Sequence, residues 1–411
     1  MNGYWEQRFA RRMGGVTSSA IRELFKAVRQ PGMISFAAGM PAPEMLPTEA
    51  VSGASQRVLA KRGQQALQYG STEGYPRLRT WIVAHMAQQG VNISADNVLI
   101  VSGGLQGLDM ASRVLLNPGD RVLVESPTFL GALQVFNAYE ISYVGVPLDE
   151  DGLQIEPLEV ALEASPRFIY AIPTFQNPAG VTLSPERRRV FVELAAQAGV
   201  PILEDDPYRQ LRYEGEHPPL LLALDMARFQ PGEWDSQGNV IYCGSFSKIL
   251  GPGLRLGWAI APAVVTQRMV QAKQGNDLHT SLYVQMVVHE VVQSGFLEQH
   301  IPRLQTFYRE RRDVMLEAMA RHFPPEVSWT RPQGGLFLWA ILPSSLNIRE
   351  LFEEALRHQV AFVPGTPFYA NQSGPPAMRL NFSYPKPEQI ETGIERLGAV
   401  LTRALSKSEN L

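Results

Sequence analysis

The sequence predicts an α/β protein that has a mostly parallel sheet with helices on both faces, followed by a smaller α+β domain. Three observations support this fold class. From residue 97 onward, short apolar segments alternate with helical stretches, as in chains that wind around a parallel sheet. These segments are apolar along their whole length, which is typical of strands buried on both faces. A long helical region then ends near Phe323, and further strands and helices follow it.

The expected elements follow from the order of apolar runs, helical spacings and turn signals. Short apolar runs predict strands at 98–101, 122–124, 142–146, 168–172, 202–203, 240–243 and 257–260. The expected helices before residue 200 are 18–28, 48–62, 75–88, 105–116, 130–139, 157–164 and 185–198. The later helical region extends to about Phe323, with interruptions expected near Gly275 and Pro302. Helices 348–358 and 387–405 are expected among the last strands.

Composition limits the classes of function. The chain has 411 residues, of which 45% are hydrophobic, and this is ample for one large domain and a smaller one. A formal net charge of −3 gives no reason to expect a nucleic acid or an anionic membrane as a partner. The single cysteine, Cys243, excludes an internal disulfide framework and fits a reducing cytosol. We see no signal peptide, membrane span or metal-ligand spacing, and so expect a cytoplasmic protein without a metal site.

One stretch combines the chemistry of a phosphate site with a reactive amine. The apolar segment 240–243 leads into SFSKILGPGLRLGW (245–258), where Ser245, Ser247, Lys248 and Arg255 stand among glycines. Hydroxyls, glycine amides and an arginine suit a phosphate group. A lysine that follows a buried strand can lose its proton and form an imine with an aldehyde. A phosphate and an aldehyde together describe pyridoxal 5′-phosphate (PLP), although a surface loop with one ordinary lysine remains the alternative.

Three further polar sites directly follow predicted strands, where ligands of such sheets lie. At Gly103-Gly104 a strand turns into a helix, whose free amides favour an anion. At Asp205, a carboxylate that follows a strand can keep the pyridine nitrogen of PLP protonated, and Tyr208 or Asn177 can reach the phenolic oxygen. Each site alone is explained equally well by a turn, a solvated acidic loop or metal ligands. The four sites together favour PLP.

The chain resembles the fold-type-I PLP-dependent aminotransferases of class I/II, and within them the 2-aminoadipate/kynurenine aminotransferase branch. The resemblance rests on SFSKILGPGLRLGW, QNPAG (176–180) and EDDPY (204–208), in this order and spacing, and extends from residues 21–22 to 378–380. It implies the PLP-dependent transferase fold of the aspartate aminotransferase type. The domains expected from it are an N-terminal arm with a substrate-covering segment over 1–45, a large PLP-binding domain over 46–300 and a small C-terminal domain over 301–411.

The resemblance also implies roles toward the cofactor. Lys248 is expected to form the internal aldimine with PLP and to shuttle the proton between substrate and cofactor. Asp205 is expected to pair with the pyridine nitrogen, and Asn177 and Tyr208 with the phenolic oxygen. Phe129 is expected to stack on the ring, at a position where tyrosine is common in the family. The residues expected around the phosphate are Gly104, Leu105, Gln106, Ser245, Ser247 and Arg255.

Four residues are expected, on the same resemblance, to face the substrate or the partner subunit. Arg379 is expected to bind the α-carboxylate with its guanidinium fork, and Gly39 to lie over the substrate. Arg22 is expected either to meet the distal carboxylate of a dicarboxylic substrate or to be a solvated helix arginine. Tyr69 is expected to reach the PLP phosphate of the neighbouring subunit, which implies a homodimer with shared active sites.

The function expected from the resemblance is ping-pong transamination between an L-amino acid and a 2-oxo acid such as 2-oxoglutarate. The amino acid is expected to be 2-aminoadipate, an aromatic amino acid such as kynurenine, or a branched-chain amino acid. One alternative keeps PLP but changes the reaction to that of a lyase, decarboxylase or cyclopropane-forming synthase. The other is a non-catalytic effector-binding domain, as in aminotransferase-like transcription regulators, although no basic winged-helix module is visible before this segment.

Overall fold

The computed structural model describes residues 3–15 and 32–408, and its centre is an eight-stranded sheet in the order β2-β9-β8-β7-β6-β3-β4-β5. The strands are β2 (Val98–Val101), β3 (Arg121–Ser126), β4 (Ser142–Asp149), β5 (Gly152–Leu153), β6 (Phe168–Ala171), β7 (Ile202–Asp205), β8 (Val240–Ser245) and β9 (Gly257–Ile260). The pairs from β8 to β4 are parallel, whereas β9 is antiparallel to both of its neighbours. The prediction of a mostly parallel sheet is confirmed.

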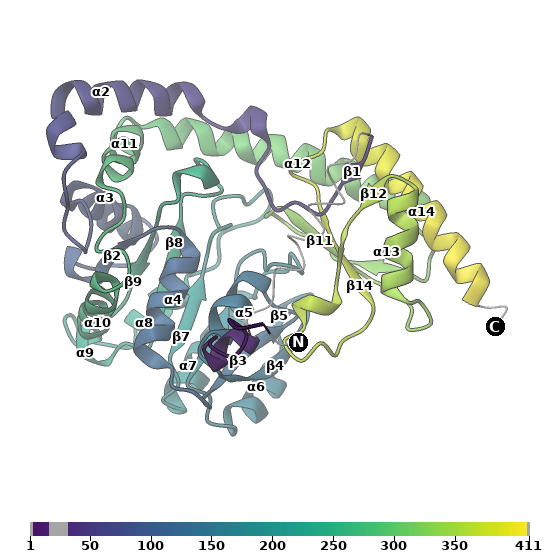
Figure 1. Cartoon of the computed structure of the whole chain (residues 1–411), viewed down its shortest axis with the longest axis horizontal. Helices are drawn as coiled ribbons and strands as arrows, with labels where there is room; N and C mark the ends of the chain where they lie inside the picture. Colours follow the sequence, from purple (N-terminus) through teal and green to yellow (C-terminus); the bar gives the residue numbers. More distant parts are fainter. Residues whose placement is uncertain (1–2, 16–31, 409–411) are drawn as a thin grey trace.

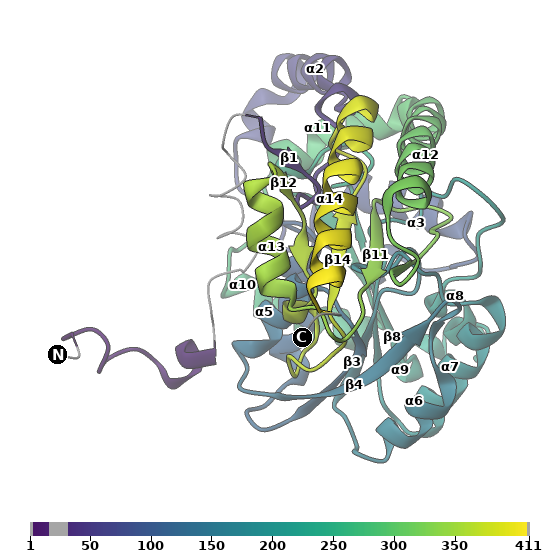
Figure 2. The ribbon, with the colours of Figure 1, turned by 90° about the vertical axis from the view of Figure 1, so that its right-hand side faces the viewer.

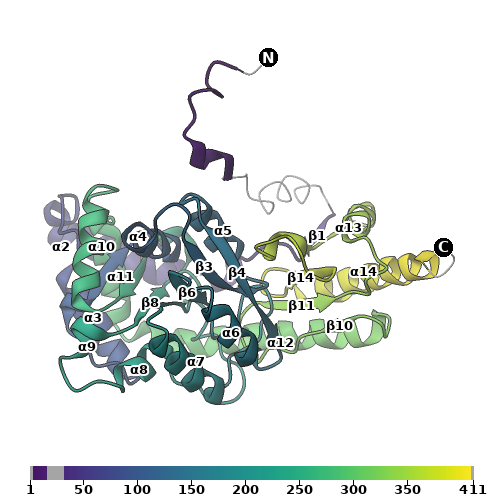
Figure 3. The same cartoon turned by 90° about the horizontal axis from the view of Figure 1, so that it is seen from below.

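Helices cover both faces of this sheet. In Figure 3, α4 (Gly104–Leu115) and α5 (Leu130–Asn137) lie above β3 and β4, whereas α6 (Ile155–Leu162), α7 (Pro185–Gln197) and α8 (Leu221–Met226) lie below them, on the opposite face. Because both faces are covered, strands β2, β6, β7, β8 and β9 are buried along their whole length. This burial accounts for their continuous apolar sequences.

A long helix connects this sheet to the second unit. α12 (Phe296–His322) runs from α11 (Leu282–Gln293) toward α14 (Pro387–Ser408) along the top of Figure 1. The expected interruption at Gly275 is confirmed, since α10 (Ala263–Gln274) ends there. The interruption expected at Pro302 is wrong, because Pro302 lies inside α12, and the break falls instead at Gly295, which has a φ of +73°. The buried face of α12, which includes Tyr308 and Met315, outweighs the single hydrogen bond that a proline removes.

The second unit is a four-stranded antiparallel sheet in the order β10-β11-β14-β13. Its strands are β10 (Ser328–Trp329), β11 (Phe337–Ile341), β13 (Val363–Pro364) and β14 (Ala377–Asn381). In Figure 2, α13 (Ile348–Arg357) and α14 lie in front of β11 and β14 and cover one face of the sheet. A short parallel pair, β1 (Ile34–Ser35) with β12 (Val360–Ala361), ties the early chain to this unit.

Two helices extend the body beside α11, namely α2 (Thr48–Ala66) and α3 (Pro76–Ala87). Residues 3–15 lie outside the main body in Figure 3, where an exposed ion pair joins Arg11 Nε to Glu140 Oε1 at 2.6 Å. Within residues 3–15 and 32–408, no helix combines the length and the apolar sequence needed to cross a membrane.

Candidate active site

The carboxyl ends of three strands bring the predicted site residues to one edge of the large sheet. β2 and β8 are both antiparallel to β9, so they run in the same direction, and β7 is parallel to β8. Gly104 therefore starts α4 beside Asp205, the last residue of β7, and Ser245, the last residue of β8. A Cβ built on Gly104 would lie 3.8 Å from Asp205 Oδ1, which shows how close these strand ends are.

Lys248 is a largely buried lysine without a carboxylate partner. Its Nζ donates a hydrogen bond to the carbonyl oxygen of Gly39 at 2.8 Å. No carboxylate in residues 3–15 and 32–408 forms an ion pair with it. Burial, together with the positive charges of Arg379 and Arg255, lowers the pKa of Lys248 to about 8. Near neutral pH the neutral fraction of this amine is therefore larger than that of an ordinary lysine, which makes it a better nucleophile and proton acceptor.

Asp205 is a buried carboxylate without a cationic partner in the described chain. Its Oδ2 accepts a hydrogen bond from Tyr170 Oη at 2.8 Å. Burial raises the pKa of Asp205 to about 7; the Tyr170 hydrogen bond opposes this shift, and the nearby carboxylate of Asp206 adds to it. A cation beside Asp205 would stabilise its charged form, and a protonated pyridine nitrogen is such a cation.

A chain of hydrogen bonds joins the two sheets across the site. Asn177 Nδ2 donates to Tyr208 Oη at 3.4 Å, and Arg379 Nη1 donates to Asn177 Oδ1 at 3.0 Å. Arg379 lies on β14 of the second sheet, and its Nη2 donates to the carbonyl of Ala37 at 2.9 Å. Arg379 is buried, and its Nε has no hydrogen-bond partner within the described ranges. The rings of Phe337 and Phe368 pack against its guanidinium.

Glycine and hydroxyl groups form a cradle at the start of α4. Gly103 has a φ of +93°, and a Cβ there would lie only 2.4 Å from Arg255 Nη2, so only glycine fits. Arg255 Nη2 donates to the carbonyl of Ser102 at 3.1 Å. Ser245 Oγ donates to Ser247 Oγ at 2.9 Å and accepts from the backbone N–H of Ser247 at 3.1 Å. Helix-terminal amides, two hydroxyls and a guanidinium are donors that suit a phosphate.

An ion pair between the buried Lys273 and the exposed Asp277 lies behind this cradle and was missed by the sequence reasoning. Lys273 Nζ donates to Asp277 Oδ1 at 2.7 Å and to Gln106 Oε1 at 2.9 Å. Gln106 Oε1 also accepts from the backbone N–H of Ser102 at 2.7 Å, while Gln106 Nε2 donates to Asp277 Oδ2 at 2.7 Å. Both polar atoms of the Gln106 side chain are thus hydrogen-bonded within the protein, so only its backbone amide is left for a ligand in the cradle. The i,i+4 spacing of Lys273 and Asp277 was the available sequence signal.

The remaining predicted residues occupy varied positions. Phe129 precedes α5, and its ring and the side chain of Leu105 both approach Gly131, where a Cβ would lie 2.5 Å and 3.0 Å from them. Tyr69 is 77% exposed and meets His279 edge-on, with ring centroids 5.8 Å apart, so it does not join the other site residues of its own chain. Arg22 lies outside the described residues.

The residues present fit PLP. A buried lysine without a carboxylate, a buried carboxylate without a cation, and a glycine cradle with hydroxyl and guanidinium donors correspond to the aldehyde, pyridine nitrogen and phosphate of that group. In contrast, the described part of the chain contains no group of three or more histidine, cysteine, aspartate or glutamate residues that could hold a metal ion.

Comparisons with known proteins agree with this chemistry. Residues 31–397 match the family model "Aminotransferase class I and II". The chain is 41% identical to aromatic-amino-acid aminotransferase 1 of Thermococcus litoralis, over 98% of this chain and 96% of that protein. It is also 41% identical to 2-aminoadipate transaminase of Thermus thermophilus, over 98% of both chains. Among solved structures, α-aminoadipate aminotransferase of Thermus thermophilus with N-(5′-phosphopyridoxyl)-L-leucine has a TM-score of 0.91, at 39% identity, covering 98% of this chain and all of that chain.

Proposed function

This chain belongs to the class I and II aminotransferases, it is a PLP-dependent aminotransferase, and we propose that it transfers the amino group of 2-aminoadipate, an aromatic or a branched-chain amino acid to 2-oxoglutarate. The observation that carries the proposal is the position of Lys248, whose amine has a lowered pKa and lies near the positive charge of Arg379. The printed names of the relatives support the substrate classes.

In the proposed roles, PLP supplies an aldehyde that condenses with amines and a ring that takes up electrons. Lys248 moves a proton at its Nζ, which its lowered pKa favours. Asp205 holds a proton at the pyridine nitrogen, and Tyr170 orients its carboxylate. Asn177 and Tyr208, which are hydrogen-bonded to each other, would donate to the phenolic oxygen.

The substrate carboxylate is assigned to Arg379. Its guanidinium is buried between two rings, and its Nε is free of protein partners in the described chain. A carboxylate there pairs with a cation in a site that excludes water, which strengthens the interaction. Gly39 is assigned to cover the substrate, and the support is the hydrogen bond that its carbonyl accepts from Lys248 Nζ. We assign the phosphate to Ser245, Ser247, Arg255 and the amides at Gly104, Leu105 and Gln106.

We further propose a homodimer in which Tyr69 and Phe129 complete the cofactor site, Tyr69 from the neighbouring subunit and Phe129 by stacking. The support is the exposure of Leu67 (75%), Tyr69 (77%) and Leu278 (45%), three large side chains at which a second copy would exclude water. Sedimentation analysis tests the dimer. Tyr69→Phe is expected to weaken PLP binding while leaving the dimer intact.

The domain boundaries are likewise proposed as an arm over 1–45, a large domain over 46–300 and a small domain over 301–411. The supports are the two separate sheets and α12, which spans the second boundary. A cytoplasmic location is proposed because the lone cysteine is free and buried. A PLP-dependent lyase or decarboxylase is not favoured, since the relatives compared are aminotransferases.

A spectroscopic titration tests the proposed substrates. The visible band of the PLP-loaded protein is expected to bleach with glutamate and with 2-aminoadipate and to recover with 2-oxoglutarate. The amino acid that bleaches it at the lowest concentration identifies the preferred class. A band that no amino acid bleaches would overturn the proposal.

Arg22 is assigned to the distal carboxylate of 2-aminoadipate, on the name of the Thermus thermophilus relative. Arg22→Ala is then expected to lower kcat/KM for 2-aminoadipate more than for leucine or phenylalanine. Equal losses for the three substrates would make it a solvated helix arginine.

A further inference from the structure

Glu125 is a buried carboxylate outside the roles proposed above. It lies on β3, one residue before the end of the strand, and is 3% exposed. The backbone N–H of Ile172 donates to both of its carboxylate oxygens at 3.2 Å, and Gln176 Nε2 donates to Oε2 at 2.9 Å. Burial raises the pKa of Glu125 to about 8; the hydrogen bonds from Gln176 and Ile172 oppose this shift, and Asp205 adds to it. Burying this carboxylate costs free energy of desolvation, which its hydrogen bonds offset.

Gln176 is the residue through which Glu125 reaches the QNPAG loop (176–180). Its side chain is buried, and its Nε2 donates to the carbonyl of Pro127 at 2.9 Å as well as to Glu125. Its Oε1 accepts from the backbone N–H of Ala179 at 2.8 Å, inside the loop itself. The amide of Gln176 thus joins the end of β3 to the turn that follows β6.

The two joined segments carry two residues that are assigned to the cofactor. Asn177 directly follows Gln176, and its side chain is hydrogen-bonded to Tyr208 and Arg379. Phe129 lies two residues after Pro127. Hydrogen bonds weaken steeply as their distance and angle depart from the optimum. A small displacement of the QNPAG loop would therefore weaken the hydrogen bonds that Asn177 makes.

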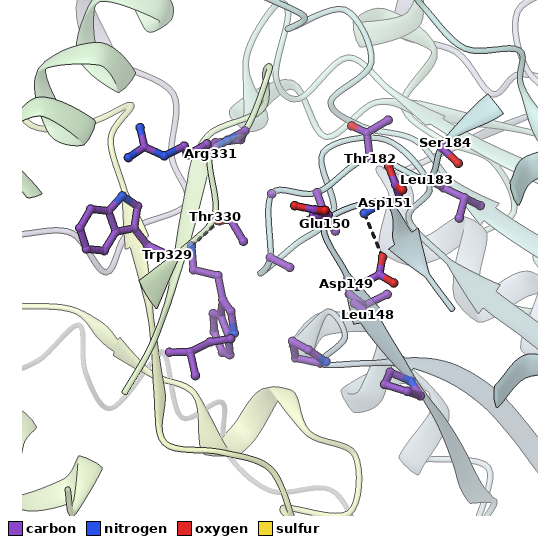
Figure 4. Close-up of a pocket in the computed structure, with 18 of the residues that line it drawn as sticks. Leu148, Asp149, Glu150, Asp151, Thr182, Leu183, Ser184, Trp329, Thr330 and Arg331 are labelled. Carbon is purple, nitrogen blue, oxygen red and sulfur yellow. Dashed lines mark hydrogen bonds between the residues drawn. The ribbon is translucent and has the colours of Figure 1, made fainter. Parts of the chain in front are cut away.

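On its other side, the stretch 179–184 borders open space. These residues contribute to the lining of a cavity of about 990 Å³ between the large sheet and the second unit. Figure 4 shows Thr182 and Ser184 on one side of this cavity and Thr330 of the second unit on the other. Close packing is interrupted there, so the hydrogen bonds on the β3 side have a larger share in holding the loop.

We propose that Glu125 and Gln176 form a clamp that positions Asn177, which makes Glu125 a positioning residue for transamination. The proposal rests on the function proposed above, in which Asn177 donates to the phenolic oxygen of PLP. Glu125 holds the amide of Gln176, and Gln176 holds the loop against the end of β3. The loop then presents Asn177 to the cofactor and to Arg379. Glu125 thus acts through Gln176 and Asn177 rather than on the cofactor itself.

The pH dependence of the visible band of the PLP-loaded protein tests this clamp. The band changes when the proton beside the phenolic oxygen leaves, and the negative charge on that oxygen then increases. A hydrogen-bond donor at this oxygen favours that state, so Asn177→Ala is expected to raise the pH midpoint of the band by about one pH unit. Glu125→Met removes both acceptor oxygens and is expected to raise the midpoint by about half a pH unit. In the Asn177→Ala background, Glu125→Met is expected to add no further change.

Two more variants separate the hydrogen bond from charge and from folding. Glu125→Gln has no charge, but its carbonyl can still accept from Gln176 Nε2, so it is expected to keep the midpoint of the wild type. Gln176→Leu removes the other half of the clamp and is expected to raise the midpoint as Glu125→Met does. It keeps the test available if Glu125→Met fails to fold.

Glu204→Met is the matched control. Glu204 is also buried on a strand of the large sheet, and it accepts from the backbone N–H groups of Leu221 and Leu222 at 3.0 Å and 2.9 Å. Because these partners belong to α8 and not to the QNPAG loop, Glu204→Met is expected to leave the midpoint unchanged. A midpoint raised equally in Glu204→Met and Glu125→Met would indicate a general disturbance of the sheet and would overturn the clamp.

The remaining outcomes distinguish the clamp from the role of Asn177. A midpoint that rises in Asn177→Ala but not in Glu125→Met or Gln176→Leu would overturn the clamp alone. A midpoint lowered in both Glu125→Met and Glu125→Gln would make Glu125 an electrostatic neighbour of Asp205 and would also overturn it, because removing a negative charge lowers a pKa. A midpoint that Asn177→Ala does not move would overturn the role proposed for Asn177, and the clamp with it.

Discussion

Two largely buried lysines of this protein lie in opposite electrostatic surroundings. Lys273, behind the phosphate cradle, is fully buried as a side chain, and its Nζ donates to both carboxylate oxygens of Asp277. Lys248, at the end of β8, has the carbonyl of Gly39 as its hydrogen-bond partner, and its charged neighbours are Arg379 and Arg255. Burial lowers the pKa of both lysines, but Asp277 opposes that effect at Lys273, whereas the two arginines reinforce it at Lys248.

Asp277 and Asp205, one carboxylate from each region, also differ in their partners, and their pKa values shift in opposite directions. Asp277 has its pKa lowered; burial raises it, but the hydrogen bonds from Gln106 and Lys273 prevail. Asp205 has no cation, and burial raises its pKa to about 7. Burial alone therefore does not separate a structural charge from a reactive one. The partner decides, because a paired group keeps its charge and a buried unpaired group tends to lose its charge.

The largest difference is expected from removing each lysine in turn. Lys248→Ala is expected to lower kcat by roughly 10³-fold or more, because the nucleophile and proton carrier are lost together. Lys273→Met is expected to retain most of kcat at saturating PLP and to bind PLP more weakly. Steady-state kinetics at a high PLP concentration measure kcat for both variants. Similar losses of kcat in the two variants would remove the distinction drawn between the lysines.

The next effect is on the stability of the PLP-free protein. The unfolded chain holds the lysine proton up to its ordinary pKa of 10.5, whereas folded Lys248 releases it at about 8. Between these values the unfolded state binds more protons, so the wild type gains stability as the pH rises. Lys248→Met is therefore expected to be more stable than the wild type by up to about 3 kcal/mol at pH 7, and to lose this advantage between pH 8 and 10.5.

Denaturant unfolding at several pH values measures that advantage. Lys273→Met is the matched control and is expected to gain less stability at pH 7 than Lys248→Met, because Asp277 opposes the effect of burial on the pKa of Lys273. An advantage of Lys248→Met that does not change with pH would indicate packing rather than a lowered pKa.

A smaller effect is expected at the unpaired carboxylate. Asp205→Asn is expected to lower kcat about 100-fold, because the amide cannot hold a proton on the pyridine nitrogen. Tyr170→Phe keeps the carboxylate and removes the hydrogen bond that lowers its pKa, so it is expected to cost less. Kinetics of the two variants at saturating PLP provide the comparison, and an Asp205→Asn variant as active as Tyr170→Phe would contradict the assigned role.

The smallest effect is expected at the paired carboxylate. Asp277→Asn removes the counter-ion of Lys273 and disturbs Gln106 and Ser102 at the cradle, so PLP affinity is expected to fall about tenfold. Equilibrium dialysis against PLP measures the change. The pH dependence of the visible band should stay as in the wild type, because Lys248 is untouched. A shifted pH dependence would mean that the two regions are coupled and that the comparison between them is too simple.

Local patterns were enough for much of the fold. Apolar runs identified most strands of the large sheet, because β2, β6, β7, β8 and β9 are buried along their whole length, and alternating helices identified the mostly parallel order. The end of a helix at Gly275 was also predicted from the sequence. Pro302 misled the prediction, since the buried face of α12 continues through it. The two-residue strands β1 and β5 were not predicted, as each is too short for a periodic pattern.

Sequence alone determined the family, the cofactor and the strand ends at which polar residues gather, because these depend on residue types at fixed spacing along one segment. The roles proposed for the individual residues stay predictions. Only the tertiary structure decided which charges are paired. Lys273 and Lys248 both lie near the end of an element. The hydrogen bonds from Lys273 to Gln106, from Lys248 to Gly39 and from Arg379 to Asn177 all join segments that are distant in sequence. The pKa and reactivity of a buried group depend on those neighbours, which no local pattern contains.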